Sequence, residues 1–309
     1  MAKVIRRVRL IAIGRLLLLL APWAFIAYLF RDVDATLDIF RDASVAPMVG
    51  ALLLMLLVLA SMALLWVRLV AHLNREVAEP ETAHLLRAFA RSWLARYLPG
   101  KVWVYGARVI HTDASVTPRR IVASSLVDEI ALILGTATAL GLGLWTWSLA
   151  GPVAGLPVLL VGLAGVVAAV SRLDQLSHLA LRFLGRMLPL RWKRAGEELQ
   201  RAGEDPGLGL RATALFTGSY LLNNLASGLA FVLVVASLGD IGWDDVPLLI
   251  GAYSLASVIS IAALFAPAGL GVREAVLAGF ITSIVASPVA ASVVVLIRVV
   301  TIIADVLFV

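Results

Sequence analysis

Apolar residues follow one another in long runs along most of this chain, with few polar positions between them. A run needs about 20 residues to cross the roughly 30 Å hydrocarbon core of a membrane as a helix. Residues 10–30 reach that length although they include Arg15, whose long side chain can place its charge at the interface. Other runs reach it without any charge, and they cover residues 43–67, 130–171, 212–239, 246–272 and 275–297. This pattern predicts a helical membrane protein.

The run from Ile130 to Ser171 has 42 residues, which is too long for one membrane-spanning helix. Gly151, Pro152 and Pro157 lie near its middle, and residues of these types interrupt helices. The run therefore predicts two helices joined by a tight turn. With this division we expect an all-α polytopic protein with about six full transmembrane helices.

Composition supports the same class. Hydrophobic residues make up 61% of the chain and charged residues 15%, and the mean hydropathy is +0.97. These values lie outside the range of a water-soluble domain of 309 residues. The absence of cysteine excludes disulfides, thiolate nucleophiles and thiolate metal sites.

The basic residues are unevenly placed, and this placement predicts the orientation. Of the 26 Lys and Arg residues, 22 fall in residues 1–15, 68–120 and 172–211, which we expect on the cytoplasmic side. The Asp-rich segments 31–42 and 239–245 are expected outside. The N-terminus is then cytoplasmic, in the inner membrane of a bacterium. Because the net charge of +6 lies beside membrane spans, it indicates topology, and we expect no nucleic-acid partner.

Residues 172–211 divide what we expect to be a single transmembrane domain, residues 1–309, into a first half (1–171) and a second half (212–309). Leucines recur in this segment at roughly helical spacing with arginines between them, which predicts a basic amphipathic helix on the inner leaflet. The alternative is a cytoplasmic linker whose basic residues only set the topology.

The first half contains an interrupted segment, "ARYLPGKVWVYGARVI", residues 95–110. Pro99 removes a backbone donor and Gly100 permits a turn. A single crossing by residues 83–110 would place Arg119 and Arg120 outside, against the charge bias. We therefore expect a re-entrant hairpin that enters and leaves on the cytoplasmic side.

A second interruption lies in "LFAPAGLGVREAVLAGF", residues 264–280. Pro267, Gly269 and Gly271 break an apolar run, and residues 275–287 would reach only about 20 Å as a helix. This segment is expected to be a half-span that enters from outside. Residues 246–266 are long enough to span alone, however. In that case the second half of the chain would only imperfectly repeat the order of spans and hairpins in the first half.

The two halves then share one order: a span, a broken hairpin and a span, with opposite orientation. Such an inverted repeat is typical of alternating-access transporters. Irregular backbone at membrane depth is tolerated only where protein or a water-filled cavity covers it. Helix ends at the breaks would offer free N–H groups beside Lys101, Arg108 and Arg273, a combination that suits a phosphate.

Other polar residues are expected inside the membrane. Asp128 and Glu129 lie about two turns inside their span, Asn223 and Asn224 lie mid-span, and Arg298 and Asp305 share one helix face. An intramembrane ionisable group indicates a functional site by default. The alternative is that these groups pair with one another and only hold helices together.

No catalytic or nucleotide-binding motif is present, so we expect no catalytic residue, no enzyme activity, no metal site and no cofactor. A lipid transferase or phosphatase is the least favoured class, because no nucleophile or metal cluster is recognisable.

The segments "YLPGKVW", "SSLVDE", "APAGLGVREAVL" and "LIRVVTI" resemble the lysylphosphatidylglycerol synthase transmembrane-region family, over roughly residues 10–309. Its best-known members form the flippase half of the bacterial multiple peptide resistance factor. The resemblance implies re-entrant helices around a central cavity and movement or binding of lipids with charged or glycosylated headgroups. No aminoacyl-transferase domain is present in these 309 residues, so we expect a stand-alone relative. The resemblance points to Pro99, Gly100, Lys101, Arg108, Glu129, Pro267, Gly269, Gly271, Arg273, Glu274 and Arg298.

With Asp128 and Asn223 added, these are the residues that we expect to bind substrate. The leading hypothesis is a translocase that moves an anionic phospholipid or a polyprenyl-phosphate-linked lipid across the cytoplasmic membrane. The alternative is a non-transporting scaffold or regulator, docked on a lipid-dependent glycosyltransferase through residues 172–211. The expected partners are lipids with anionic headgroups. Three further partners are left open: a membrane glycosyltransferase, a lipid synthase or a second copy of the chain.

Overall fold

The computed structural model describes residues 39, 41, 43–73, 81–98, 102–112, 116–146, 209–262, 269, 271–282, 285 and 287–309. All regular structure in these residues is helical, which confirms the predicted all-α class. The predicted spans at 10–30 and 151–171 and the loop at 172–208 lie outside the described residues. The elements are α3 (Val45–Leu73), α4 (Thr82–Trp93), η1 (Leu94–Tyr97), α5 (Val102–His111), α6 (Pro118–Thr146), α10 (Gly209–Ala236), α11 (Asp245–Ala262), α12 (Val272–Ile281) and α13 (Ser287–Phe308).

Several helices have the length and surface of membrane spans. In the described part of the chain, α3, α10 from Ala214 and α13 are long and apolar enough to cross a membrane. The outward faces of α3 and α10 carry large apolar side chains at helical spacing, which is the surface that acyl chains require. These side chains are Val45, Val49, Leu53, Leu57 and Leu64 on α3, and Leu215, Leu222 and Leu229 on α10. The chain is a multi-pass membrane protein.

The first predicted hairpin is a pair of short helices. α4 has 12 residues and α5 has 10, so neither exceeds about 18 Å, well short of a full crossing. η1 extends α4 by one tighter turn, and Leu98 leaves the helix with extended backbone, as expected for a residue before proline. α4 and α5 pack against each other. The segment therefore turns back on itself between these helices.

The second interruption gives a less symmetric pair. α11 has 18 residues, about 27 Å, which is close to the thickness of the hydrocarbon core. α12 has only 10 residues and packs back against α11. The two halves thus share an order of elements, but the first helix of the second pair is longer than α4.

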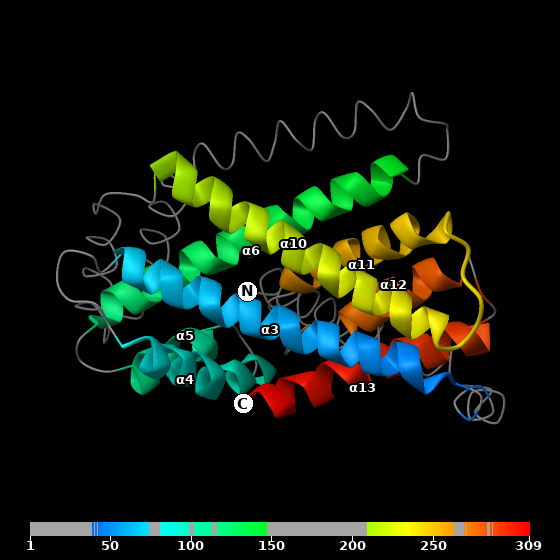
Figure 1. The fold of residues 1–309 in the computed structure, drawn as a ribbon, viewed down its shortest axis with the longest axis horizontal. Helices are drawn as coiled ribbons and strands as arrows, with labels where there is room; N and C mark the ends of the chain where they lie inside the picture. The colour runs from blue at the N-terminus through cyan, green and yellow to red at the C-terminus, as the bar shows by residue number, and fades with distance from the viewer. Residues whose placement is uncertain are drawn as a thin grey trace, which may run out of the picture.

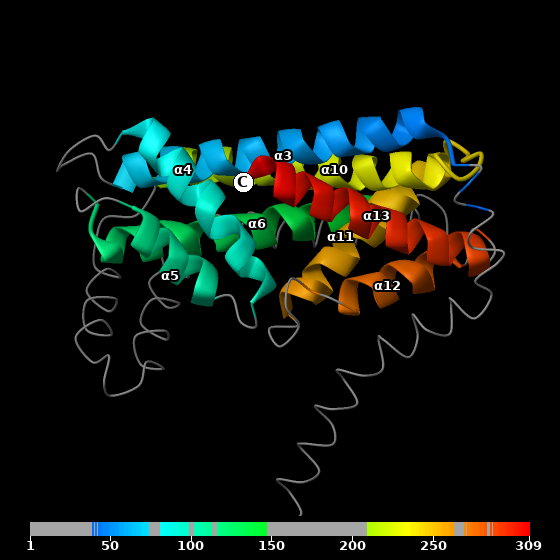
Figure 2. The ribbon, with the colours of Figure 1, turned by 90° about the horizontal axis from the view of Figure 1, so that it is seen from below.

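The packing of the two halves follows the same plan. α3 contacts α10 at the centre, α3 packs on α13 as α10 packs on α6, and α5 packs on α6 as α12 packs on α13. Figure 1 and Figure 2 show α4 and α5 toward one end of the long axis and α11 and α12 toward the other. These matched pairs are expected of an inverted repeat. The extensive contact between α6 and α11, however, has no counterpart of similar extent between α13 and α4.

α6 and α10 cross very closely at Gly135. A Cβ atom on Gly135 would lie 2.6 Å from the Leu221 backbone N and 2.7 Å from the Tyr220 carbonyl carbon. Both atoms belong to backbone, so a small side chain cannot be accommodated by rotamer changes alone. Close approach of small residues is a common means of helix association in membranes.

Gly135→Ala should therefore destabilise the fold, by about 1–3 kcal/mol, because α6 and α10 must separate. Gly218→Ala on α10 is the matched control, since nothing lies within 4 Å of its Cβ position. That change should be neutral or stabilising by up to about 1 kcal/mol through helix propensity. Thermal unfolding in detergent measures both, and equal melting temperatures for the two variants would contradict the close crossing.

Candidate functional site

A cavity of about 240 Å³ lies between the two broken helix pairs. Leu98, directly before the first break, and Gly269, at the second, both line it. Long helices from both halves complete its wall. The charged residues that line it are Arg96, Arg108, Asp128, Glu129, Arg273 and Asp305.

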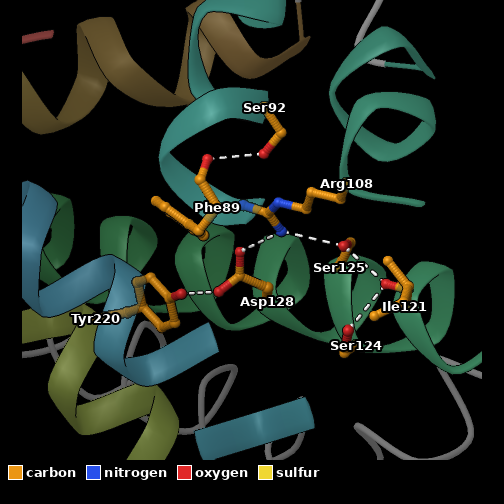
Figure 3. Close-up of polar contacts among 8 residues, drawn as sticks. All are labelled: Phe89, Ser92, Arg108, Ile121, Ser124, Ser125, Asp128 and Tyr220. Atoms are coloured by element: carbon orange, nitrogen blue, oxygen red, sulfur yellow. Dashed lines mark hydrogen bonds and ion pairs between the residues drawn. The ribbon is translucent and has the colours of Figure 1, made fainter. Parts of the chain in front are cut away.

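Arg108, near the end of α5, is the most enclosed of these cations, with 3% of the residue exposed. Its guanidinium carbon lies 4.8 Å from the ring centroid of Trp66 and 4.5 Å from that of Phe89. Its Nη1 donates to Ser125 Oγ at 3.0 Å and to Asp128 Oδ2 at 3.3 Å (Figure 3). Two aromatic faces and a carboxylate thus replace the water that this charge loses.

Asp128 on α6 receives donors from two other helices. The Arg108 guanidinium contacts one carboxylate oxygen, and the Tyr220 hydroxyl on α10 donates to the other (Figure 3). Ser125 Oγ donates to the Ile121 carbonyl at 2.8 Å, so a lone pair of this hydroxyl remains for Arg108. Asp128 therefore joins α5, α6 and α10, and each of its oxygens already accepts one hydrogen bond.

Arg273, next to the second break, differs from Arg108. Its guanidinium lies 4.3 Å from the ring centroid of Tyr253 on α11. Its Nη2 is inaccessible to solvent and has no hydrogen-bond partner among the described residues. In that part of the chain it also pairs with no carboxylate, whereas Arg96 lies 3.7 Å from Asp305. Arg273 is thus a cavity cation with donor capacity to spare.

The two asparagines of α10 have different roles. Asn224 donates to Thr136 Oγ1 on α6 at 3.0 Å and accepts from Ser254 Oγ on α11 at 2.7 Å, so it holds three helices together. Asn223 lines the cavity, and its Nδ2 is buried with no partner among the residues described. The sequence left a binding role and a helix-joining role open for the pair. The structure shows helix-joining contacts for Asn224, and both residues line the cavity.

Gly269 and Gly271 explain the G-x-G spacing at the second break. Their φ angles are +70° and +81°, in the left-handed region that side chains disfavour. The Gly271 N–H, which the sequence suggested as a free donor for phosphate, instead donates to Glu274 Oε2 at 2.7 Å. Glu274 Oε1 lies 3.3 Å from Arg298 Nη1. A carboxylate of the chain itself therefore bonds the N-cap N–H at the start of α12.

The structure thus sorts the predicted residues into three groups. Pro99, Gly100, Lys101 and Pro267 lie outside the described residues. Gly271, Glu274 and Arg298 form the contacts at the start of α12 and are not among the cavity-lining residues of the described chain. Those that line the cavity are Arg108, Asp128, Glu129, Asn223, Gly269 and Arg273.

Asp305 is the main cavity residue that the predicted set omitted. It was expected on one face with Arg298, and a pairing between the two was left open. Instead it accepts from Trp93 Nε1 at 2.8 Å and from the Tyr97 hydroxyl at 2.6 Å. Trp93 and Tyr97 are four residues apart and hence lie on one helix face. Two polar-tipped aromatic residues at this spacing directly before Pro99 were the sequence signal that could have indicated a buried acceptor.

Arg108→Gln should destabilise the fold by about 3 kcal/mol or more, because Asp128 would remain buried without its cation. Adding Asp128→Asn should recover part of this loss, since the uncompensated charge is then removed. Thermal unfolding of the wild type, both single variants and the double variant gives the interaction energy. Strictly additive losses would show that the pair contributes nothing.

The sequence was also compared with known proteins and protein families. No curated protein matches the sequence. Residues 11–308 match the family model described as lysylphosphatidylglycerol synthase TM region, which covers nearly the whole chain and confirms the resemblance seen in the motifs. On this match and the helical membrane architecture, the chain belongs to the lysylphosphatidylglycerol synthase transmembrane-region family.

Proposed function

We propose that this protein binds the phosphate-bearing headgroup of an anionic lipid in the cavity between its two breaks and moves that lipid across the membrane. The family is a membrane domain associated with lipid metabolism. The observation that carries the proposal is Arg273, whose Nη2 is buried at the cavity and bonded to no described residue. A buried cationic donor without a partner is costly unless a ligand supplies the acceptor.

The size of the cavity favours a headgroup over a whole lipid. Its volume of about 240 Å³ is below the roughly 300–1,000 Å³ of sites that enclose drug-sized ligands. In the proposed mechanism the acyl chains stay outside, among apolar helix faces such as those of α3 and α10. Only the polar group then needs a protein environment while it crosses the hydrocarbon core.

The proposed roles of the cavity residues follow from their contacts. Arg273 binds the phosphate, because its donors are the least occupied. Arg96 assists, because its pair with Asp305 is long at 3.7 Å and its side chain is 29% exposed. Arg108 already donates from Nη1 to Ser125 and Asp128, although its buried Nε has no partner among the described residues, and it positions the wall. Lys101 is proposed as a further phosphate contact and Glu129 as a counter-ion.

The proposed setting is the cytoplasmic membrane of a bacterium, with the N-terminus inside, because 22 of the 26 basic residues fall in the three segments assigned to that side. The inverted order of the two halves suits exchange between states open to opposite leaflets.

Proteoliposomes with fluorescent phosphatidylglycerol in both leaflets test this function by dithionite quenching. Wild-type protein should expose the inner-leaflet lipid, and Arg273→Gln should slow this by about tenfold or more, as expected when a hydrogen bond to a charged group is lost. Arg91→Gln is the matched control, since Arg91 lies on α4 with an exposed side chain and is not among the described cavity-lining residues.

Several results would count against the proposal. Vesicles with wild-type protein that behave as empty vesicles, for phosphatidylglycerol and for a polyprenyl-phosphate lipid alike, would exclude translocation of these lipids. Equal slowing by Arg91→Gln and Arg273→Gln would remove the assigned role of Arg273 while leaving transport itself in place.

A further inference from the structure

The last helix, α13, contacts the chain at both breaks through two charged residues on one face. Asp305 is buried, with 1% of the residue exposed. It accepts hydrogen bonds from Trp93 and Tyr97 and lies near Arg96. All three donors belong to the last two turns before Pro99. One carboxylate therefore holds one side of the helix that leads into the first break.

Arg298 makes the corresponding contact at the second break. It lies seven residues before Asp305, about two turns along the same face. Its Nη1 contacts Glu274 Oε1, and Glu274 Oε2 accepts the Gly271 N–H. Since Gly271 is the left-handed residue from which α12 starts, Arg298 holds the start of that half-span through one carboxylate.

The two sets of contacts meet at Tyr97. Its hydroxyl donates to Asp305, and the Arg298 guanidinium carbon lies 5.6 Å from its ring centroid. The contacts therefore run without interruption from Trp93 and Tyr97, through Asp305 and Arg298, to Glu274 and Gly271. We call this series the α13 link.

We propose that Asp305 and Arg298 are positioning residues which, through the α13 link, make the backbone at each break depend on the other. Asp305 and Arg96 also line the cavity. An anion bound to Arg96 would compete with Asp305, whose ion pair with that arginine is long at 3.7 Å, compared with 3.3 Å between Arg298 and Glu274. Ligand binding at one break would then loosen contacts that extend to the second. The effect of ligand binding on the link rests on the proposed function, whereas the link itself does not depend on that function.

The link can be tested without a transport assay, because the chain has no cysteine. Leu98→Cys reports on the first break and Ser260→Cys on the second, since both positions line the cavity and Ser260 lies directly against Gly269. The readout is the rate at which a water-soluble maleimide labels each cysteine in the purified full chain in lipid nanodiscs.

Glu274→Gln, made at the second break, should change the labelling rate of Leu98→Cys at the first by about fivefold or more, the lower end of typical coupling between sites. Asp305→Asn should in turn change the rate at Ser260→Cys. Tyr97→Phe, which removes only the hydroxyl contact, should also change the labelling rate at Ser260→Cys. This variant replaces the others in the test if either charge change prevents folding.

Ser254→Ala is the matched control, because it removes a buried hydrogen bond to Asn224 outside the link. It should leave the rate at Leu98→Cys unchanged. The proposal is overturned if Glu274→Gln, Asp305→Asn and Tyr97→Phe alter labelling only at their own break, or if Ser254→Ala alters Leu98→Cys labelling as strongly as Glu274→Gln does. Either result leaves the lipid-transport proposal standing, because no lipid movement is measured.

Discussion

A helix that stops inside the hydrocarbon core leaves polar backbone groups that lipid cannot satisfy, and the rest of the fold answers that constraint. α4, α5 and α12 are too short to cross that core, and α3, α6, α10 and α13 pack against the two pairs that contain them. At the second break the Gly271 N–H is bonded by Glu274. Leu98 and Gly269, which lie beside the two breaks, both line the cavity, and only protein or water can border such backbone.

The same constraint governs the buried charges. Asp128 on α6 is bonded from α5 and α10, Asp305 on α13 from α4 and η1, and Glu274 from its own helix start and from α13. Each carboxylate thus joins segments that are far apart along the chain. What remains unbonded among the described residues at the cavity, notably on Arg273 and Asn223, is donor capacity, which suits an anionic ligand.

Much of this architecture could be predicted because it depends on local features. The apolar runs at 130–171 and 212–239 predicted spans, and the helices observed there are Pro118–Thr146 and Gly209–Ala236. The Pro-Gly pair at 99–100 and the glycines at 269 and 271 marked both interruptions. The greater length of α11 relative to α4 was left open, because residues 246–266 could be divided into a helix and a break in more than one way.

The sequence by itself determined the membrane class, the order of spans and breaks, and which helix face carries each polar residue, since these follow from hydropathy, helical period and backbone freedom. Only the tertiary structure decided the partners. Arg298 and Asp305 share a face yet contact opposite breaks. The adjacent Asn223 and Asn224 both line the cavity, but only Asn224 has hydrogen-bond partners on neighbouring helices. The reason is that a helical period sets direction around one axis, whereas the partner met in that direction depends on where other helices cross.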